Sequence, residues 1–202
     1  MEKKRITPER IKEVIREVMN EMSPEQRSPE HRSADPGPKK ISSGEAPRSG
    51  ARKTACSVAI GGDHGGFKLK ETLKKYLEEE LGISVRDLGT HSQESVDYPD
   101  FAIAVARAVA TGECEKGIVI DTMGIGSSIA ANKIKGARAA LCHDLQTAKN
   151  SRGHNDANVL ALGSKIVNPG LARAIVKAWL ATSFEGGRHA KRVQKIIDAE
   201  RC

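Results

Sequence analysis

The sequence predicts an α/β fold in which a parallel sheet is covered by helices on both faces. From residue 57 onward, short runs rich in β-branched residues alternate with longer stretches of helical periodicity. Such alternation is typical of a parallel sheet with helices packed on each side. A length of 202 residues suits one domain of this kind with some excess.

The predicted domain, residues 56–202, contains five strands and six helices. The β-rich runs predict strands at 57–61, 83–88, 117–120, 137–142 and 158–162. The helical periodicity predicts helices at 66–80, 98–111, 125–133, 145–152, 169–182 and 188–201. Ligands of such sheets bind beyond the carboxyl ends of the strands, so we expect functional residues in the loops that follow the strands.

Residues 1–55 precede this domain and divide into two segments. Residues 1–22 predict an amphipathic helix, with Thr7 as its cap and Pro8 in its first turn. Its apolar stripe is formed by Ile11, Val14, Ile15, Val18, Met19 and Met22. A helix of about four turns is marginal alone, so the stripe implies a partner surface. Residues 23–55, rich in Pro, Ser, Gly and charge, predict a disordered, flexible linker.

The composition excludes several classes of protein. A hydrophobic content of 38% and a charged content of 29% are typical of a soluble globular protein, and no apolar run is long enough to cross a bilayer. The N-terminus lacks the features of a secretory signal, so the cytoplasm is the expected location. The cysteines, which form no CxxC pair, are expected to be reduced thiols and predict neither a zinc nor a redox motif. They are Cys56, Cys114, Cys142 and Cys202.

The net charge of +7 raises the possibility of nucleic-acid binding. Residues 1–55 contain 13 Lys and Arg against nine Asp and Glu, so the predicted domain carries only +3. Aromatic residues make up 3% of the chain, which leaves no stacking platform for bases. We therefore expect neither a nucleic-acid nor a membrane partner.

Two of the loops after strands could approach a ligand closely. GGDHGGFKLK places Asp63 and His64 among four glycines, although an ordinary strand-to-helix turn with an aspartate cap explains the same residues. DTMGIGSSIAANK, residues 121–133, follows a buried strand and opens a helix, so its N–H groups can face an anion. Asp121 could accept a proton from a substrate or could simply cap that helix, and the spacing favours neither interpretation.

Two later stretches contain residues suited to proton transfer and phosphate binding. His154 lies between a helix and the fifth strand and could transfer protons near neutral pH. His143 is more typical of a capping or surface histidine. In FEGGRHAKRV, Arg188 and Arg192 lie four residues apart on one helical face, which suits a phosphate but also an ordinary solvated basic face.

Taken together, these stretches resemble the family of type B ribose-5-phosphate isomerases and galactose-6-phosphate isomerase subunits. The resemblance covers residues 57–200 and includes GGDHGGFKLK, SVDYPDFA, GIGSSIAANK, RAALCHD, SRGHNDANVLALGSK and FEGGRHAKRV in the family's order. It implies a Rossmann-like three-layer sandwich with a five-stranded parallel sheet. It also implies a homodimer or homotetramer with shared active sites that isomerises an aldose phosphate through an enediolate. Ribose 5-phosphate to ribulose 5-phosphate is the leading reaction.

The resemblance also assigns roles to residues. The expected catalytic residues are Asp121, His154, Asn155, Gly124 and Gly126. The expected substrate-binding residues are Asp63, His64, Tyr98, Met123, Ser127, Lys165, Arg188 and Arg192. His154 and Asn155 match the pair linked to ring opening. Lys165, where arginine is usual, would bind the phosphate with the two arginines, which a neighbouring subunit supplies in the family. No cofactor or metal is expected, because the sequence offers no cluster of ligands at convincing spacing.

The departures from the family pattern fall in the loop at 121–126. The usual CGTGIG reads DTMGIG here, so the thiol base is absent. Other family members carry a glutamate at the place of Ser127, which this chain also lacks, and Met123 replaces a hydroxyl residue. Either Asp121 is the base or proton transfer is lost. The alternative to an isomerase is therefore a sugar-phosphate-binding protein of the same fold.

The helix and linker of residues 1–55 resemble the encapsulation peptides that carry enzymes into bacterial microcompartments. Residues 8–22 would then dock on a shell or cargo protein. Two other interpretations are packing of the helix on its own isomerase domain and binding to a membrane surface, which the acidic residues of the helix disfavour.

Overall fold

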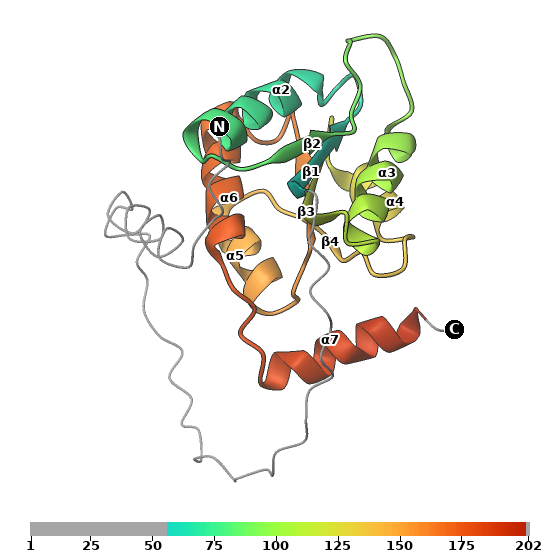
Figure 1. Cartoon of the computed structure of the whole chain (residues 1–202), viewed down its shortest axis with the longest axis vertical. Coiled ribbons are helices and arrows are strands. Elements are labelled where there is room, and N and C mark those ends of the chain that lie inside the picture. The colour runs from blue at the N-terminus through green and yellow to red at the C-terminus, as the bar shows by residue number, and fades with distance from the viewer. Residues whose placement is uncertain (1–55, 201–202) are drawn as a thin grey trace.

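A five-stranded, all-parallel sheet lies at the centre of residues 56–200, the part of the chain that the computed structural model describes (Figure 1). Its strand order is β2-β1-β3-β5-β4. The strands are β1 (Cys56–Gly62), β2 (Val85–Asp87), β3 (Cys114–Asp121), β4 (Ala139–Leu141) and β5 (Val159–Gly163). The predicted α/β class and five-stranded parallel sheet are confirmed. The predicted N-terminal helix and linker lie outside the described residues.

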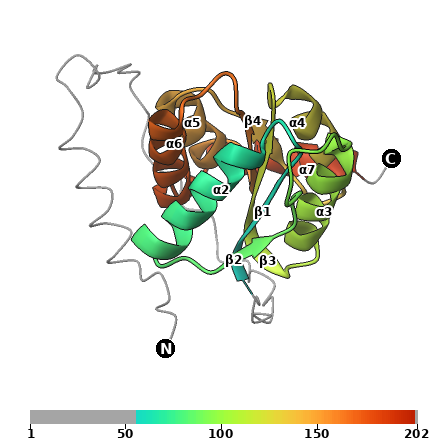
Figure 2. The same ribbon diagram turned by 90° about the horizontal axis from the view of Figure 1, so that it is seen from above.

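Helices cover both faces of the sheet, which gives three layers (Figure 2). One face carries α2 (Phe67–Lys75), α5 (Leu145–Gly153) and α6 (Pro169–Ala181), and the other carries α3 (Tyr98–Ala110) and α4 (Ile125–Ala131). Apolar side chains of the strands alternate between two cores, one around Trp179 and one around Val105. Burial on both faces explains why β3 and β5 are nearly continuous runs of Val, Ile, Leu, Ala and Gly.

The last helix, α7 (Arg188–Ala199), lies outside this sandwich, across the amino-terminal ends of the strands (Figure 1). The Glu185 N–H donates to the Gly153 carbonyl at 3.0 Å, just before the helix begins. At its far end Glu200 accepts from the Gly136 N–H at 3.1 Å. Because Gly153 ends α5 and Gly136 precedes β4, both anchors are at the amino-terminal edge of the sheet.

Two details differ from the sequence prediction. The stretch predicted as one helix at 66–80 continues beyond α2 as a π-helical turn, η2 (Tyr76–Glu80). Cys56 and Cys114 form a disulfide between β1 and β3, so the prediction of reduced thiols is wrong for this pair. The two cysteines are 58 residues apart in sequence, and only the pairing of the strands brings them together. None of the helices within residues 56–200 has the length and apolar character needed to cross a membrane.

Candidate functional site

The predicted site residues divide between the two edges of the sheet. The carboxyl edge, where the strands end, carries Asp63, His64, Tyr98, Asp121, Met123, Gly124, Gly126, Ser127 and Lys165. The amino edge, where the strands begin, carries His154, Asn155, Arg188 and Arg192. Helices α5 and α6 explain this division, because each starts beyond the carboxyl end of a strand, β4 or β5, and returns the chain to the amino edge.

At the carboxyl edge, Asp121 organises the loop between β3 and α4. Its side chain is 5% exposed. Oδ1 accepts from the N–H groups of Met123, at 2.8 Å, and Gly124, while Oδ2 accepts from the Ser127 N–H at 2.9 Å. A carboxylate bound by three amides both caps α4 and fixes the loop.

This arrangement determines which amides remain for a substrate. The Gly124 N–H, expected to face the enediolate, is bonded to Asp121 instead. The N–H groups of Ile125 and Gly126 have no acceptor within residues 56–200. Ser127 is 2% exposed and contributes its backbone N–H rather than an accessible hydroxyl. An incoming oxyanion would therefore meet Ile125 and Gly126.

The backbone of the loop requires glycine at two positions. Gly124 has φ of +80°, and a Cβ there would lie 2.9 Å from the Leu162 carbonyl carbon. A Cβ at Gly126 would lie 2.5 Å from Tyr98 Cζ, so the tyrosine ring lies directly over this glycine. Met123, at 43% exposed, lies on the open side of the loop. The Lys165 N–H donates to the Thr122 carbonyl at 3.1 Å, which ties the end of β5 to the same loop.

Asp63 and His64 follow β1 at the same edge. Asp63 is buried, and its Oδ1 accepts from the Gly66 N–H at 2.8 Å. His64 is exposed, and its Nδ1 lies 3.3 Å from the backbone N of Val96 in the loop before α3. Both the cap interpretation of Asp63 and its position at a candidate site are consistent with this geometry.

The turn that carries His154 and Asn155 is fixed by a network of charged side chains. Asp156 has φ of +47°, a left-handed conformation that Asp tolerates better than most residues. Its carboxylate accepts from Arg138 at 2.9 Å and from Arg152 at 2.8 Å. The Arg138 Nε also donates to the Asp156 carbonyl at 2.9 Å. Sequence analysis missed this network, because its only sign in the sequence is the turn-forming pair Asn155 and Asp156.

His154 lies in a cluster with Glu185 and His189. The His154 and His189 rings stack with centroids 4.0 Å apart and planes inclined by 10°. Glu185 Oε2 lies 3.5 Å from His154 Nε2 and 3.8 Å from His189 Nε2. Burial lowers the pKa of His189, and the neighbouring His154 and Arg188 lower this pKa further. His189 is therefore neutral at neutral pH.

This cluster is the one group of potential metal ligands found within residues 56–200, but its geometry does not suit an ion. Nitrogen lone pairs lie in the planes of their rings, and two rings stacked at a centroid distance of 4.0 Å with planes inclined by only 10° cannot both direct a lone pair at one ion. Arg188 Nε also lies 3.4 Å from His189 Nε2, which adds positive charge where a cation would bind.

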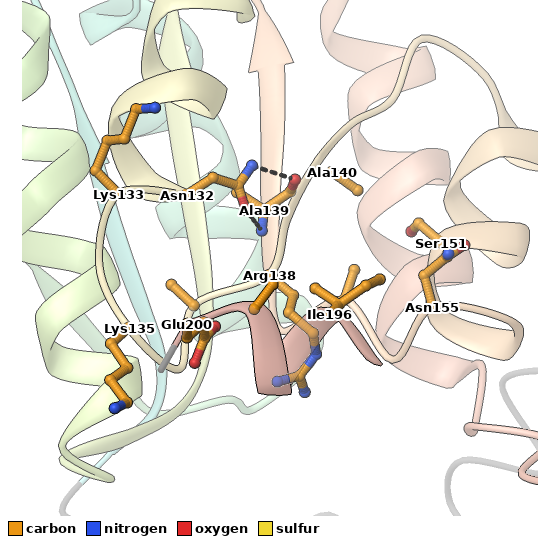
Figure 3. A pocket seen from close by; sticks show the side chains of 13 residues that line it. Asn132, Lys133, Lys135, Arg138, Ala139, Ala140, Ser151, Asn155, Ile196 and Glu200 are labelled. Atoms are coloured by element: carbon orange, nitrogen blue, oxygen red, sulfur yellow. Dashed lines mark hydrogen bonds between the residues drawn. The ribbon is translucent and has the colours of Figure 1, made fainter. Parts of the chain in front are cut away.

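Basic side chains and a hollow mark the rest of the amino edge. A groove along α7 is lined by Gly187, Arg188, Lys191, Arg192 and Lys195. Asn155 is part of the wall of a separate hollow of about 620 Å³ between α5, α7 and the loop before β4 (Figure 3). Beside this hollow, the Asn132 amide bonds the backbone N–H and carbonyl of Ala139 and so caps the outer edge of β4.

One chain keeps the two groups of candidate residues apart. The five residues of β5 separate the edges, and at about 3.3 Å per residue they span roughly 16 Å of packed core. A small phosphorylated ligand cannot contact both edges of the same chain.

Comparisons with known proteins identify the family that this chain resembles. The family described as Ribose/Galactose Isomerase matches residues 58–196. The chain is 50% identical to ribose-5-phosphate isomerase B of Escherichia coli over 143 residues, which cover 71% of this chain and 95% of that protein. It is 43% identical to a D-erythrulose-4-phosphate isomerase of Pectobacterium atrosepticum over 141 residues, 69% of this chain and 92% of the relative. The structure of ribose-5-phosphate isomerase B of Clostridium thermocellum matches with a TM-score of 0.71 and 53% identity, covering 72% of this chain and 97% of that one.

Proposed function

The chain belongs to the Ribose/Galactose Isomerase family of sugar-phosphate isomerases, and on this premise we propose that it interconverts ribose 5-phosphate and ribulose 5-phosphate. The observation that supports this most is the chemistry of the two edges. One edge has a buried carboxylate beside two unpaired amides, and the other has a histidine beside two arginines. Together they supply a base, an oxyanion site, a group for ring opening and a phosphate site.

Asp121 is the proposed base. Oδ1 accepts two amides and Oδ2 accepts one, so Oδ2 retains a lone pair for the C2 proton. As this proton leaves, its bonding electrons form a C1–C2 double bond and the former carbonyl oxygen becomes the enediolate oxygen. The N–H groups of Ile125 and Gly126 would stabilise that charge. Return of the proton to C1, with a hydroxyl proton moving from O2 to O1, completes the ketose.

The proposed active site is built from two chains. The carboxyl edge of one chain would face the amino edge of another, which places His154, Asn155, Arg188 and Arg192 against the partner's Asp121 loop. Exposed apolar side chains on α4 and α7 support contact with a second copy of this chain. They are Ile125, Ile129 and Ile196.

The substrate can be tested through the need for ring opening. Ribose 5-phosphate is mainly a closed furanose, whereas erythrose 4-phosphate cannot close such a ring because its 4-oxygen carries the phosphate. We expect purified protein to form ketose from ribose 5-phosphate. His154→Asn should lower kcat/KM for this substrate by about 10²-fold while changing that for erythrose 4-phosphate much less. Faster turnover of the tetrose by the wild type would identify the four-carbon substrate as the physiological one.

A sugar-phosphate binder without turnover is the second candidate, because the family's thiol base is replaced. Calorimetry with ribose 5-phosphate distinguishes the two functions. Binding without ketose formation from any aldose phosphate would support a binding protein and contradict the proposed isomerase activity.

We also propose that residues 8–22 target the enzyme to a bacterial microcompartment, from the sequence pattern alone. Residues 1–55 fused to a fluorescent protein should be recruited by shell proteins, and Val14→Glu with Val18→Glu should abolish recruitment. Diffuse fluorescence of the unmodified fusion would contradict targeting.

A further inference from the structure

We propose that Glu185 and His189 are positioning residues that hold His154 ready for opening the sugar ring, an inference that rests on the proposed function. Neither residue is among those that sequence analysis assigned to the site. Glu185 lies in the segment that joins α6 to α7, and His189 lies in the first turn of α7, while His154 directly follows α5. The structure brings the three together at the amino edge.

Two neighbours orient the nitrogens of His154. The Asn150 side-chain amide lies 2.8 Å from Nδ1 and donates to it when the ring proton is on Nε2. Nε2 then points its N–H toward the Glu185 carboxylate at 3.5 Å. That separation is longer than an ordinary N–H···O hydrogen bond, so Nε2 can still bond a substrate oxygen while the carboxylate orients it.

Glu185 is itself fixed by the end of α5. Its N–H donates to the Gly153 carbonyl at 3.0 Å, one residue before His154. A Cβ at Gly153 would lie 2.9 Å from Glu185 Oε1, so the carboxylate lies directly over this glycine. The hydrogen bond to the Gly153 carbonyl and the lack of a side chain at Gly153 together place the Glu185 carboxylate beside the His154 imidazole.

His189 fixes the plane of the ring. It is 6% exposed, and it stacks on His154 with centroids 4.0 Å apart. Two protonated rings at this separation would repel each other, so the pair takes up one proton more readily than two. The charged groups facing the pair are Glu185, which favours a proton on His189, and Arg188 and Arg192, which disfavour it; burial lowers the pKa of His189 most. Protonation of His189 is therefore disfavoured, and its ring acts as a neutral stacking surface for His154.

Opening of the sugar ring requires that His154 be oriented for the transfer of one proton. The C1–O4 bond of the furanose breaks, O4 gains a proton, and the hydroxyl on C1 loses one to become the carbonyl. His154 in its imidazolium form delivers the first proton from Nε2 to O4, and the proton of the C1 hydroxyl passes to solvent; this transfer requires that the ring keep one orientation. Glu185 keeps a proton on Nε2, and His189 sets the orientation.

The test separates ring opening from isomerisation. Exchange between the two anomers of ribose 5-phosphate, labelled with ¹³C at C1, is followed by NMR in an Asp121→Asn background, where proton removal from C2 is blocked. Added protein should accelerate exchange. Glu185→Gln and His189→Ala should each lower that acceleration by about tenfold or more. His189→Phe, which keeps a flat ring, should recover most of it. Gln194→Ala, an exposed change on α7, serves as the control.

Turnover of the variants without the Asp121 change provides the second readout. Glu185→Gln and His189→Ala should lose kcat/KM for ribose 5-phosphate but not for erythrose 4-phosphate, which has no ring to open. Equal losses for both sugars, or unaltered anomer exchange in the folded variants, would overturn the inference while leaving the isomerase intact. Accelerated anomer exchange by a wild type that forms no ketose would overturn the proposed function instead.

Discussion

The two edges of the sheet are organised by aspartates in different ways. Asp121 at the carboxyl edge is bound by backbone amides that lie two to six residues away. Asp156 at the amino edge is bound by the side chains of Arg138 and Arg152, from a loop and a helix. The first arrangement leaves amides and a carboxylate for proton chemistry, and the second supports histidine and arginine side chains. Neither edge alone contains all the groups of the proposed active site.

Removing the cations of the amino edge should have the largest effect. Charge-assisted contacts contribute about 1.5 to 3 kcal/mol each, so Arg188→Ala with Arg192→Ala should weaken substrate binding by about 3 to 6 kcal/mol. Calorimetric titration with ribose 5-phosphate measures this loss. Arg86→Ala, which removes an exposed cation paired with Glu113, is the control. Unchanged affinity in the folded double variant would show that the phosphate binds elsewhere.

Removing the carboxylate of the carboxyl edge should mainly reduce the chemical step. Asp121→Asn should lower kcat by about 10²- to 10⁴-fold, the usual contribution of a general base. Asp121→Cys would restore the thiol that is usual in the family and should recover part of the activity. Circular dichroism checks that α4 is intact in both variants. Full activity of Asp121→Asn would remove Asp121 from the mechanism.

Breaking the charged network at Asp156 should affect folding stability before chemistry. Asp156→Ala leaves Arg152, which is 6% exposed, without its carboxylate partner; because the Asp156 side chain is 33% exposed, we expect a loss of about 1 to 3 kcal/mol. Asp156→Asn should cost less, because Asn tolerates the positive φ and retains one acceptor oxygen. Urea unfolding measures both. Equal stability of Asp156→Ala and wild type would show that the network does not hold the turn.

The smallest expected effect is a dependence of stability on acid pH. The pKa of His189 lies below its ordinary value of 6.5, so in the window below 6.5 the unfolded chain binds a proton that the folded chain resists. Stability should therefore fall as pH drops through that window. His189→Phe should show a shallower fall between pH 7.5 and 5.5 in urea midpoints. An identical slope would mean that other groups cause the acid sensitivity.

The part of this molecule that can be predicted from sequence is the part built from local contacts. The alternation of strands and helices and the Asp121 cap depend on neighbours within a few residues. The disulfide of Cys56 with Cys114 and the pairing of Arg138 with Asp156 link residues 58 and 18 positions apart. No pattern in a single sequence marks such pairs.

The same limit applies to the division of the site. Motif order places His154 and Arg188 in one family pattern with Asp121, yet the chain directions of α5 and α6 place these two residues at the opposite edge of the sheet. A sequence pattern does not indicate which of its residues come from the same chain in the proposed two-chain site.

Complementation between two inactive variants tests the two-chain site most directly. Asp121→Asn has a defective carboxyl edge, and Arg188→Ala with Arg192→Ala has a defective amino edge. After the two are unfolded together in urea and refolded in equal amounts, random pairing should yield mixed dimers with one intact site each. About a quarter of wild-type activity should then appear, although neither variant is active alone. Activity of the mixture no higher than that of the separate variants, with mixed dimers present, would contradict a site shared between two chains.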